Sequence, residues 1–188
     1  MVAEPIRNKL HLRKMAKYCL ERKNYRNHAM IVLGVHTALR ISDLLRLTWN
    51  DVYDFERDEY RSHVALIEKK TGKKKTIALN KQVIAALRAY FPHRRGNSLF
   101  PNNRKSSNAI SRVQAYRIIR MIADAVGITD RISCHSLRKT FGYHAWKSGV
   151  AAVLLMDIFN HSSFDITRRY LGISQDDRDS VYLGLALV

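Results

Sequence analysis

The amino-acid sequence predicts a mainly α-helical protein with one small antiparallel β-sheet, which places it in the α+β class. Apolar residues recur at helical spacing through most of the 188 residues, whereas short β-favouring runs occur only between residues 61 and 79. A chain of this length fits a single domain with its own core. Three prolines and eight glycines, without a repeat or a biased tract, give no sign of a linker.

The first third of the chain predicts three helices in succession. Residues 8–22 form an amphipathic pattern, and residues 25–39 are apolar enough for a helix buried on most sides. Arg40 follows directly, and Ser42 or Asp43 is expected to cap a new helix. An arginine at such a junction can project into a shared cleft, although taken alone it is more often a surface residue.

A hairpin with a lysine-loaded tip is predicted next. Residues 61–68 and 76–79 favour strands, and the connection 69–75 holds five lysines in seven residues together with Gly72, which permits a tight turn. Lysines at this density are either a solvated loop or a finger that contacts the phosphates of a polyanion.

Two more helices frame a polar loop. Asn80 is expected to cap a helix at 81–90, residues 96–107 lack periodicity, and a helix at 111–126 is stopped by Gly127. Together with the earlier elements, this predicts a mostly helical chain with one small sheet.

The charge balance points to a polyanionic partner. The chain holds 33 Lys and Arg against 16 Asp and Glu, a net charge of +17, with a sequence pI of about 10.2. The charges are spread over the whole chain, which is typical of a folded nucleic-acid binder. A membrane partner fits less well because the longest apolar runs, 29–35 and 181–188, are much shorter than the roughly 18 residues of a membrane span.

The stretch 132–170 carries an unusual density of groups that bind phosphate or move protons: His135, Arg138, His161 and Tyr170. His135 and Arg138 stand three residues apart, so on a helix they share a face and can reach one phosphate. Each of these residues alone has an ordinary interpretation, as surface charge or as packing, and their combination is what favours a site.

A metal site is the alternative for part of this stretch. Its ligands would be Cys134, His135, His144 and His161, but no spacing among them resembles a structural zinc set, and the surrounding cations oppose a metal ion. The two cysteines, Cys19 and Cys134, have no nearby cysteine partner, so a reducing cytoplasm is expected rather than a disulfide framework.

Five motifs in order resemble those of the tyrosine recombinase (phage integrase) family, over roughly residues 25–170. They are ALRISDL at 38–44, KKTG at 69–72, HSLRKTF at 135–141, HSS at 161–163 and the tyrosine at 170. As a set they are far more specific than any one of them. The resemblance implies the catalytic-domain fold of that family.

The resemblance also implies a role for each matched residue. Arg40 and Arg138 grip the scissile phosphate, His135 and His161 assist, Lys70 donates a proton, and Tyr170 attacks. Fixed guanidinium forks suit the charge of a pentacoordinate phosphate, and a phenol with an ordinary pKa near 10 needs cations and an imidazole to become a nucleophile. His135 could be the general base. Rivals of Lys70 as the acid, and further basic residues expected to contact DNA, are Lys69, Lys73, Lys74, Lys75, Arg104 and Lys139.

The chain departs from the family pattern in two places. Phe159-Asn160 stands where many members have Leu-Gly before the histidine, but asparagine tolerates the left-handed helix terminus that glycine provides. Only about two dozen residues precede Tyr25, so a single catalytic domain (1–188) without a separate amino-terminal core-binding domain is expected, with weak DNA affinity or dependence on a partner.

The implied activity is site-specific cleavage and rejoining of double-stranded DNA through a 3′-phosphotyrosyl intermediate, with no metal, cofactor or ATP. A homotetramer on DNA, accessory DNA-bending proteins and a bacterial, phage or mobile-element origin are expected with it. The alternatives are a basic DNA-binding regulator of the same fold and a type IB topoisomerase-like activity. The apolar tail 181–188 either packs on its own domain or docks on a neighbouring protomer.

Overall fold

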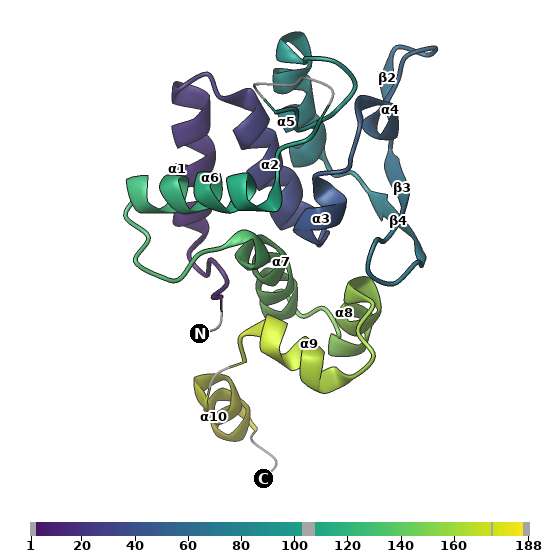
Figure 1. Cartoon of the computed structure of the whole chain (residues 1–188). Helices are drawn as coiled ribbons and strands as arrows, with labels where there is room; N and C mark the ends of the chain where they lie inside the picture. Colours follow the sequence, from purple (N-terminus) through teal and green to yellow (C-terminus); the bar gives the residue numbers. More distant parts are fainter. Residues whose placement is uncertain (1–2, 103–107, 174, 186–188) are drawn as a thin grey trace.

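The computed structural model describes residues 3–102, 108–173 and 175–185, and it confirms the predicted mainly helical class (Figure 1). The helices are α1 Lys9–Glu21, α2 Tyr25–His36, α3 Ile41–Leu44, α4 Trp49–Val52, α5 Lys81–Tyr90, α6 Arg112–Ala125, α7 Cys134–Lys147, α8 Ala152–Phe159, α9 Phe164–Leu171 and α10 Gln175–Gly184, with a 3-10 turn, η1, at Phe91–His93. The strands are β1 Tyr53–Asp54, β2 Glu59–Tyr60, β3 His63–Ile67 and β4 Lys74–Ala78.

The cap predicted at Asn80 is confirmed, and the helices predicted from residues 8 and 111 are capped in the same way. The side chains of Asn8, Asn80 and Ser111 accept hydrogen bonds from the backbone of the first turns of α1, α5 and α6. The cap predicted for α3 was wrong. Arg40 holds the cap position without a side-chain bond, because the Asp43 carboxylate is buried and accepts instead from the Lys69 backbone N–H at 2.9 Å.

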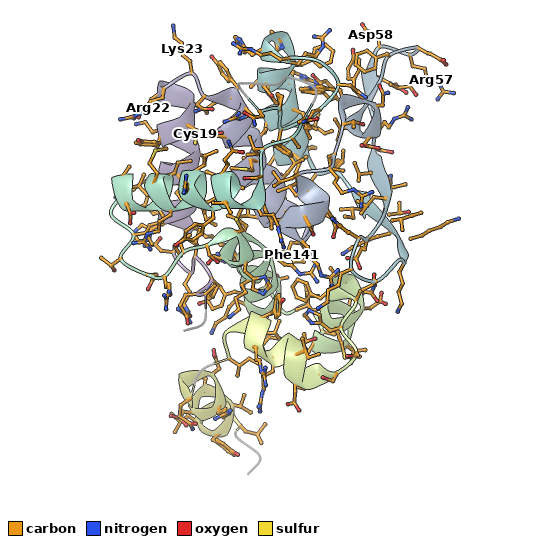
Figure 2. The ribbon with its side chains drawn as sticks, viewed as in Figure 1. Cys19, Arg22, Lys23, Arg57, Asp58 and Phe141 are labelled. Carbon is orange, nitrogen blue, oxygen red and sulfur yellow. The ribbon has the colours of Figure 1, made fainter. Side chains whose placement is uncertain are left out.

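The lysine-bearing hairpin is shorter in its turn than predicted. β3 pairs antiparallel with β4, with Val64 opposite Ile77 and Ile67 opposite Lys74, so Lys74 and Lys75 lie in a strand and only 68–73 form the turn. The separate β1–β2 ladder was not predicted, because its strands are only two residues each. Arg57 and Asp58 lie at its tip, at the opposite end of the molecule from α8 and α9 (Figure 2).

Buried apolar residues form two clusters. The main core lies among α1, α2, α5, α6 and α7 and includes the fully buried Met30, Leu33 and Ile119. The second, here called the C-terminal cluster, consists of Ala38, Leu155, Phe159 and Leu171 with Phe141, Trp146 and Tyr170 packed against it. Helix α7 lies between the two, and α8 and α9 lie beyond it (Figure 1).

Glycines on α7 and its neighbour allow close helix packing on both sides. A Cβ atom added at Gly34 of α2 would lie 2.5 Å from Leu137 Cδ1, and one added at Gly142 of α7 would lie 2.8 Å from Phe159 Cζ. These distances are too short for a real Cβ contact, so close packing at both positions requires glycine. The helix that carries His135 and Arg138 is therefore fitted closely to the main core and to the C-terminal cluster.

An amino-terminal strap, defined as residues 3–7, runs along α7. The Ile6 N–H donates to Thr140 Oγ1 at 2.9 Å, the Ile6 carbonyl oxygen lies 3.0 Å from His144 Nε2, and the Ile6 side chain is buried. The Lys139 ammonium donates to the Ala3 carbonyl at 2.8 Å. The strap thus covers the side of α7 that faces away from Arg138.

Candidate active site

Arg138 is the centre of the candidate site. It is 1% exposed, its Nη1 donates to the Ala38 carbonyl, and its Nη2 donates to the Phe159 carbonyl at 2.6 Å. Burial and the neighbouring Arg40 charge lower the pKa of Arg138 to about 10, while Tyr170, through its charge and a hydrogen bond, opposes that shift. Arg138 is therefore a positioned, charged fork that joins the turn before Arg40 to the end of α8.

Arg40 reaches the same place from a turn with an unusual backbone. Ala38 has φ +55°, a left-handed conformation that costs energy for a residue with a Cβ. This turn aims the Ala38 carbonyl at Arg138 and leaves Arg40 extended, with Nη1 2.8 Å from Glu68 Oε1. The Arg40 side chain is 18% exposed, so it is mostly buried but still reaches solvent.

Tyr170 on α9 is half-buried among three rings. Its ring centroid lies 4.8 Å from that of His135, 4.6 Å from that of His161 and 5.2 Å from that of Phe159. The Arg138 guanidinium carbon is 5.8 Å from the Tyr170 centroid. The phenol is thus beside two imidazoles and one guanidinium, although the four side chains come from α7, from α9 and from the turn between α8 and α9.

Both imidazoles are neutral at neutral pH. Burial, followed by the charges of Arg138 and other cations, lowers the pKa of His135 and of His161 to about 4 in each case. His161 Nδ1 also forms a hydrogen bond with the buried Thr167 Oγ1 at 3.0 Å, which fixes the ring. A neutral imidazole beside a phenol can accept its proton.

The hairpin lysines occupy different environments. Lys70 is exposed in the turn, and its charge is close enough to lower the pKa of both His135 and His161. Lys73 Nζ donates to Asn160 Oδ1 at 3.0 Å, and Lys75 Nζ donates to the Ile158 carbonyl at 2.6 Å. Within the part of the chain that the structure describes, no hydrogen bond or ion pair engages the Lys70 ammonium.

Strand geometry explains why Lys75 differs from its neighbours. Side chains alternate along β4, so Lys75 shares the half-buried face with Ile77, while Lys74 and Thr76 are exposed. Burial, with the Arg138 charge as the next cause, lowers the pKa of Lys75 to about 8. Lys69 and Lys74 are exposed, and their contact with DNA stays a prediction.

Two predicted DNA-contacting residues have a different outcome. Lys139 is only 5% exposed and bonds to the Ala3 carbonyl, so the prediction that it faces DNA was wrong: the strap covers it. Arg104 lies outside the described residues.

Asn160 adopts the backbone conformation that the sequence predicts. Its φ of 52° and ψ of 49° are left-handed, and its N–H closes the end of α8 immediately before His161. The sequence did not predict what its side chain does. Asn160 Nδ2 donates to Glu68 Oε2 at 2.9 Å and to Thr71 Oγ1 at 3.2 Å.

Glu68 is the most prominent residue that the sequence argument missed. It is fully buried, and although burial alone would raise its pKa, hydrogen bonds from Asn160 and Thr71 and the ion pair with Arg40 lower the pKa to about 2. Thr167 and the Ala38 and Phe159 carbonyls were missed as well, because backbone acceptors carry no sequence signal. Glu68 could have been noticed as the one acidic residue beside the lysine run.

Neither a metal cluster nor a membrane span is found among the described residues. Among them, no three His, Cys, Asp or Glu side chains are grouped so as to hold a metal ion. Cys19 on α1 (Figure 2) and Cys134 are free thiols, and burial raises the pKa of Cys19 to about 12. No helix in the described ranges has both the length and the apolar character for crossing a membrane.

The fold and the site together match the tyrosine recombinase class. In that class, two arginines, two histidines and a lysine are expected to accompany one tyrosine. A family model for the phage integrase family matches residues 9–176. The chain is 35% identical over 181 residues to the probable integrase/recombinase YoeC of Bacillus subtilis (strain 168), covering 96% of each. It therefore belongs to the phage integrase family, as predicted.

More distant relatives agree on the fold. The chain is 26% identical over 169 residues to the tyrosine recombinase XerD of Mycobacterium leprae (strain TN), covering 85% of this chain and 52% of XerD. The crystal structure of XerA recombinase superposes with a TM-score of 0.76 at 20% identity, over 97% of this chain and 64% of that one. The crystal structure of a lambda integrase dimer bound to a COC′ core site superposes with a TM-score of 0.69 at 18% identity, over 95% of this chain and 49% of that one. The chain thus spans about half the length of XerD and of lambda integrase.

Proposed function

We propose that this protein cleaves and rejoins DNA at specific sites through a covalent 3′-phosphotyrosyl intermediate on Tyr170. The observation that carries the proposal is the position of the Tyr170 ring beside two neutral imidazoles, with the guanidinium carbon of the buried Arg138 5.8 Å from the Tyr170 ring centroid. Family membership, and the YoeC relative that matches almost end to end, support the same activity.

In this mechanism Arg40 and Arg138 bind the non-bridging oxygens of one phosphodiester, where negative charge gathers as the fifth oxygen arrives. The Tyr170 oxygen attacks phosphorus while its proton passes to His135. The bond from phosphorus to the 5′ oxygen breaks, and Lys70 gives that oxygen a proton. The phosphotyrosyl ester retains the bond energy, so attack by a 5′ hydroxyl reverses the step without ATP.

Double-stranded DNA is the proposed partner. A net charge of +17 favours it, and solved relatives include XerH bound to difH substrate and the Tn1549 transposon integrase with circular intermediate DNA. Exchange between two duplexes breaks four strands, and each break occupies one Tyr170, so we infer a homotetramer on DNA, aided by accessory DNA-bending proteins. Action on the chromosome of a bacterium or mobile element would place the protein at the nucleoid.

The test is covalent capture. Duplexes bound by the wild-type protein are selected from a randomised pool and rebuilt with a nick near the cleavage site, so that the short fragment is lost and the intermediate accumulates. The wild-type protein should become linked to DNA through Tyr170. Tyr170→Phe should bind with an unchanged Kd but form no covalent product.

Two outcomes would contradict the proposal. Capture by Tyr170→Phe would remove the nucleophile assignment. Binding by the wild-type protein without capture on any selected duplex would favour a DNA-binding regulator of the same fold. Relaxation of supercoiled plasmids that lack the selected site would instead indicate a topoisomerase.

A further inference from the structure

Glu68 is a buried carboxylate at the start of the hairpin turn, two residues before Lys70. Its Oε1 lies 2.8 Å from Arg40 Nη1 and 3.9 Å from Lys75 Nζ. Its Oε2 accepts from Asn160 Nδ2 at 2.9 Å and from Thr71 Oγ1 at 2.8 Å. One carboxylate therefore ties together the Arg40 turn, the Lys70 turn and the end of α8.

The Asn160 amide completes this link from the other side. Its Nδ2 donates to Glu68 and Thr71, and its Oδ1 accepts from Lys73. All three partners belong to the hairpin turn, and His161 is the next residue along the chain. A glycine would satisfy the left-handed backbone equally well, so the backbone alone does not account for the asparagine.

Burying the Glu68 carboxylate is energetically unfavourable, which argues that the arrangement is functional. A fully buried carboxylate is strongly unfavourable unless ion pairs and hydrogen bonds compensate it. Here they do, and the pKa of Glu68, lowered to about 2, keeps it charged. This buried carboxylate lies two residues before the proposed acid. Lys70 is exposed on a flexible side chain and has no hydrogen-bond or ion-pair partner of its own within the described residues.

We propose that Glu68 and Asn160 are a positioning pair that fixes the Lys70 turn relative to His161 and Arg40, so that proton delivery to the leaving 5′ oxygen depends on them. The inference rests on the proposed function. Neither residue exchanges a proton with the substrate. Their effect is to hold the acid near the attack geometry, where small displacements reduce rates strongly.

The experiment compares two leaving groups. The selected nicked duplex is made with the natural 5′ oxygen and with a 5′-bridging sulfur at the scissile position. A thiolate leaves without a proton because thiols have a pKa near 8.5, so the sulfur substrate bypasses the general acid. Single-turnover capture is measured on both duplexes for the wild-type protein, Lys70→Ala, Asn160→Gly and Glu68→Gln.

Asn160→Gly is the decisive variant, because it keeps the left-handed terminus, removes the amide and does not contact Arg40. It should capture the oxygen substrate about 10- to 100-fold more slowly, which is less than the roughly 10²- to 10⁴-fold cost of losing a general acid altogether, and capture the sulfur substrate at the wild-type rate. Glu68→Gln should show the same rescue with a residual defect, because it also weakens the hold on Arg40. Glu59→Gln, an exposed carboxylate on β2, is the matched control and should leave both rates unchanged.

The outcomes separate this inference from the proposed function. Suppose that the sulfur substrate rescues Lys70→Ala. If Asn160→Gly is then slowed equally on both substrates, or is slowed on neither substrate, the positioning role is overturned and the covalent mechanism stands. If the wild-type protein is captured by neither substrate, the proposed function itself fails. Thermal unfolding of each variant checks folding, and the Asn160→Gly result decides even if Glu68→Gln does not fold.

Discussion

The main core and the C-terminal cluster hold different halves of the candidate site. The main core lies among five helices and supports the Arg40 turn from one side. The C-terminal cluster is built largely from α8 and α9, carries His161 and Tyr170, and leaves Val153 74% exposed and Leu154 53% exposed on α8. The proposed phosphate grip thus rests on the more extensive packing, and the proposed nucleophile rests on the less extensive packing.

This difference suggests which half can move. Local opening needs least free energy where few apolar contacts are buried, so α8 and α9 should open before α2. Arg138 couples the halves because its two hydrogen bonds end on Ala38 and Phe159. A recombinase that must form and release a tyrosyl linkage gains from a fixed clamp and a nucleophile that can withdraw.

The largest expected effect comes from breaking that coupling. Arg138→Ala should reduce covalent capture by on the order of 10²-fold or more, because a charge-stabilising donor is lost and two buried carbonyls lose their partner. Arg138→Lys should recover little, since one ammonium cannot serve both carbonyls and the phosphate. Arg40→Ala, measured in the same assay, should lose a similar factor. Near-normal capture in both alanine variants would disprove the clamp.

A matched pair of glycine substitutions separates the two regions more finely. Gly34→Ala presses α7 against the main core at Leu137, and Gly142→Ala presses it against Phe159 of the C-terminal cluster. Each should lower the free energy of unfolding by about 1–3 kcal/mol, measured by denaturant unfolding. Only Gly142→Ala should also slow capture, on the order of 10-fold, because Phe159 stacks on His161 and packs on Tyr170. Equal slowing by both would show that the two regions act as one.

Stability should also depend on pH. The folded pKa values of His135 and His161 are about 4, below the ordinary 6.5, so the unfolded chain binds more protons between these values. Stability should be full above pH 6.5 and decline as the pH falls toward 4. Glu68, with a folded pKa of about 2 against 4.5, adds a loss only below pH 4.5.

Urea unfolding at pH 7.5, 6 and 5 measures this decline, with His135→Gln/His161→Gln as the comparison. The double variant should be less sensitive to pH over this range. Amide exchange should show the loss first in α9. An unchanged slope in the double variant would mean that other groups cause the decline.

Sequence reasoning succeeded where a local rule applied. It gave the helix starts at Asn8, Asn80 and Ser111, and the left-handed Asn160. It failed where a residue's environment depends on segments that are distant in the sequence. Lys139 stands next to Arg138, and nothing local tells that residues 3–7 return to cover it.

The Glu68 link was out of reach for the same reason. Its partners lie 28 residues before it, at Arg40, and 92 residues after it, at Asn160. The Ala38 conformation was equally hidden, since its φ of +55° is set by the helices on either side and by the guanidinium that its carbonyl meets. Such groups belong to the tertiary structure, and no periodicity marks them.

The amino-terminal strap has a mechanical consequence. Because the Ile6 N–H and carbonyl are anchored at Thr140 and His144, tension applied at the start of the chain is delivered to α7, two residues beyond Arg138, before it reaches α1. Residues 3–7 therefore link this end of the chain mechanically to the helix that carries His135 and Arg138.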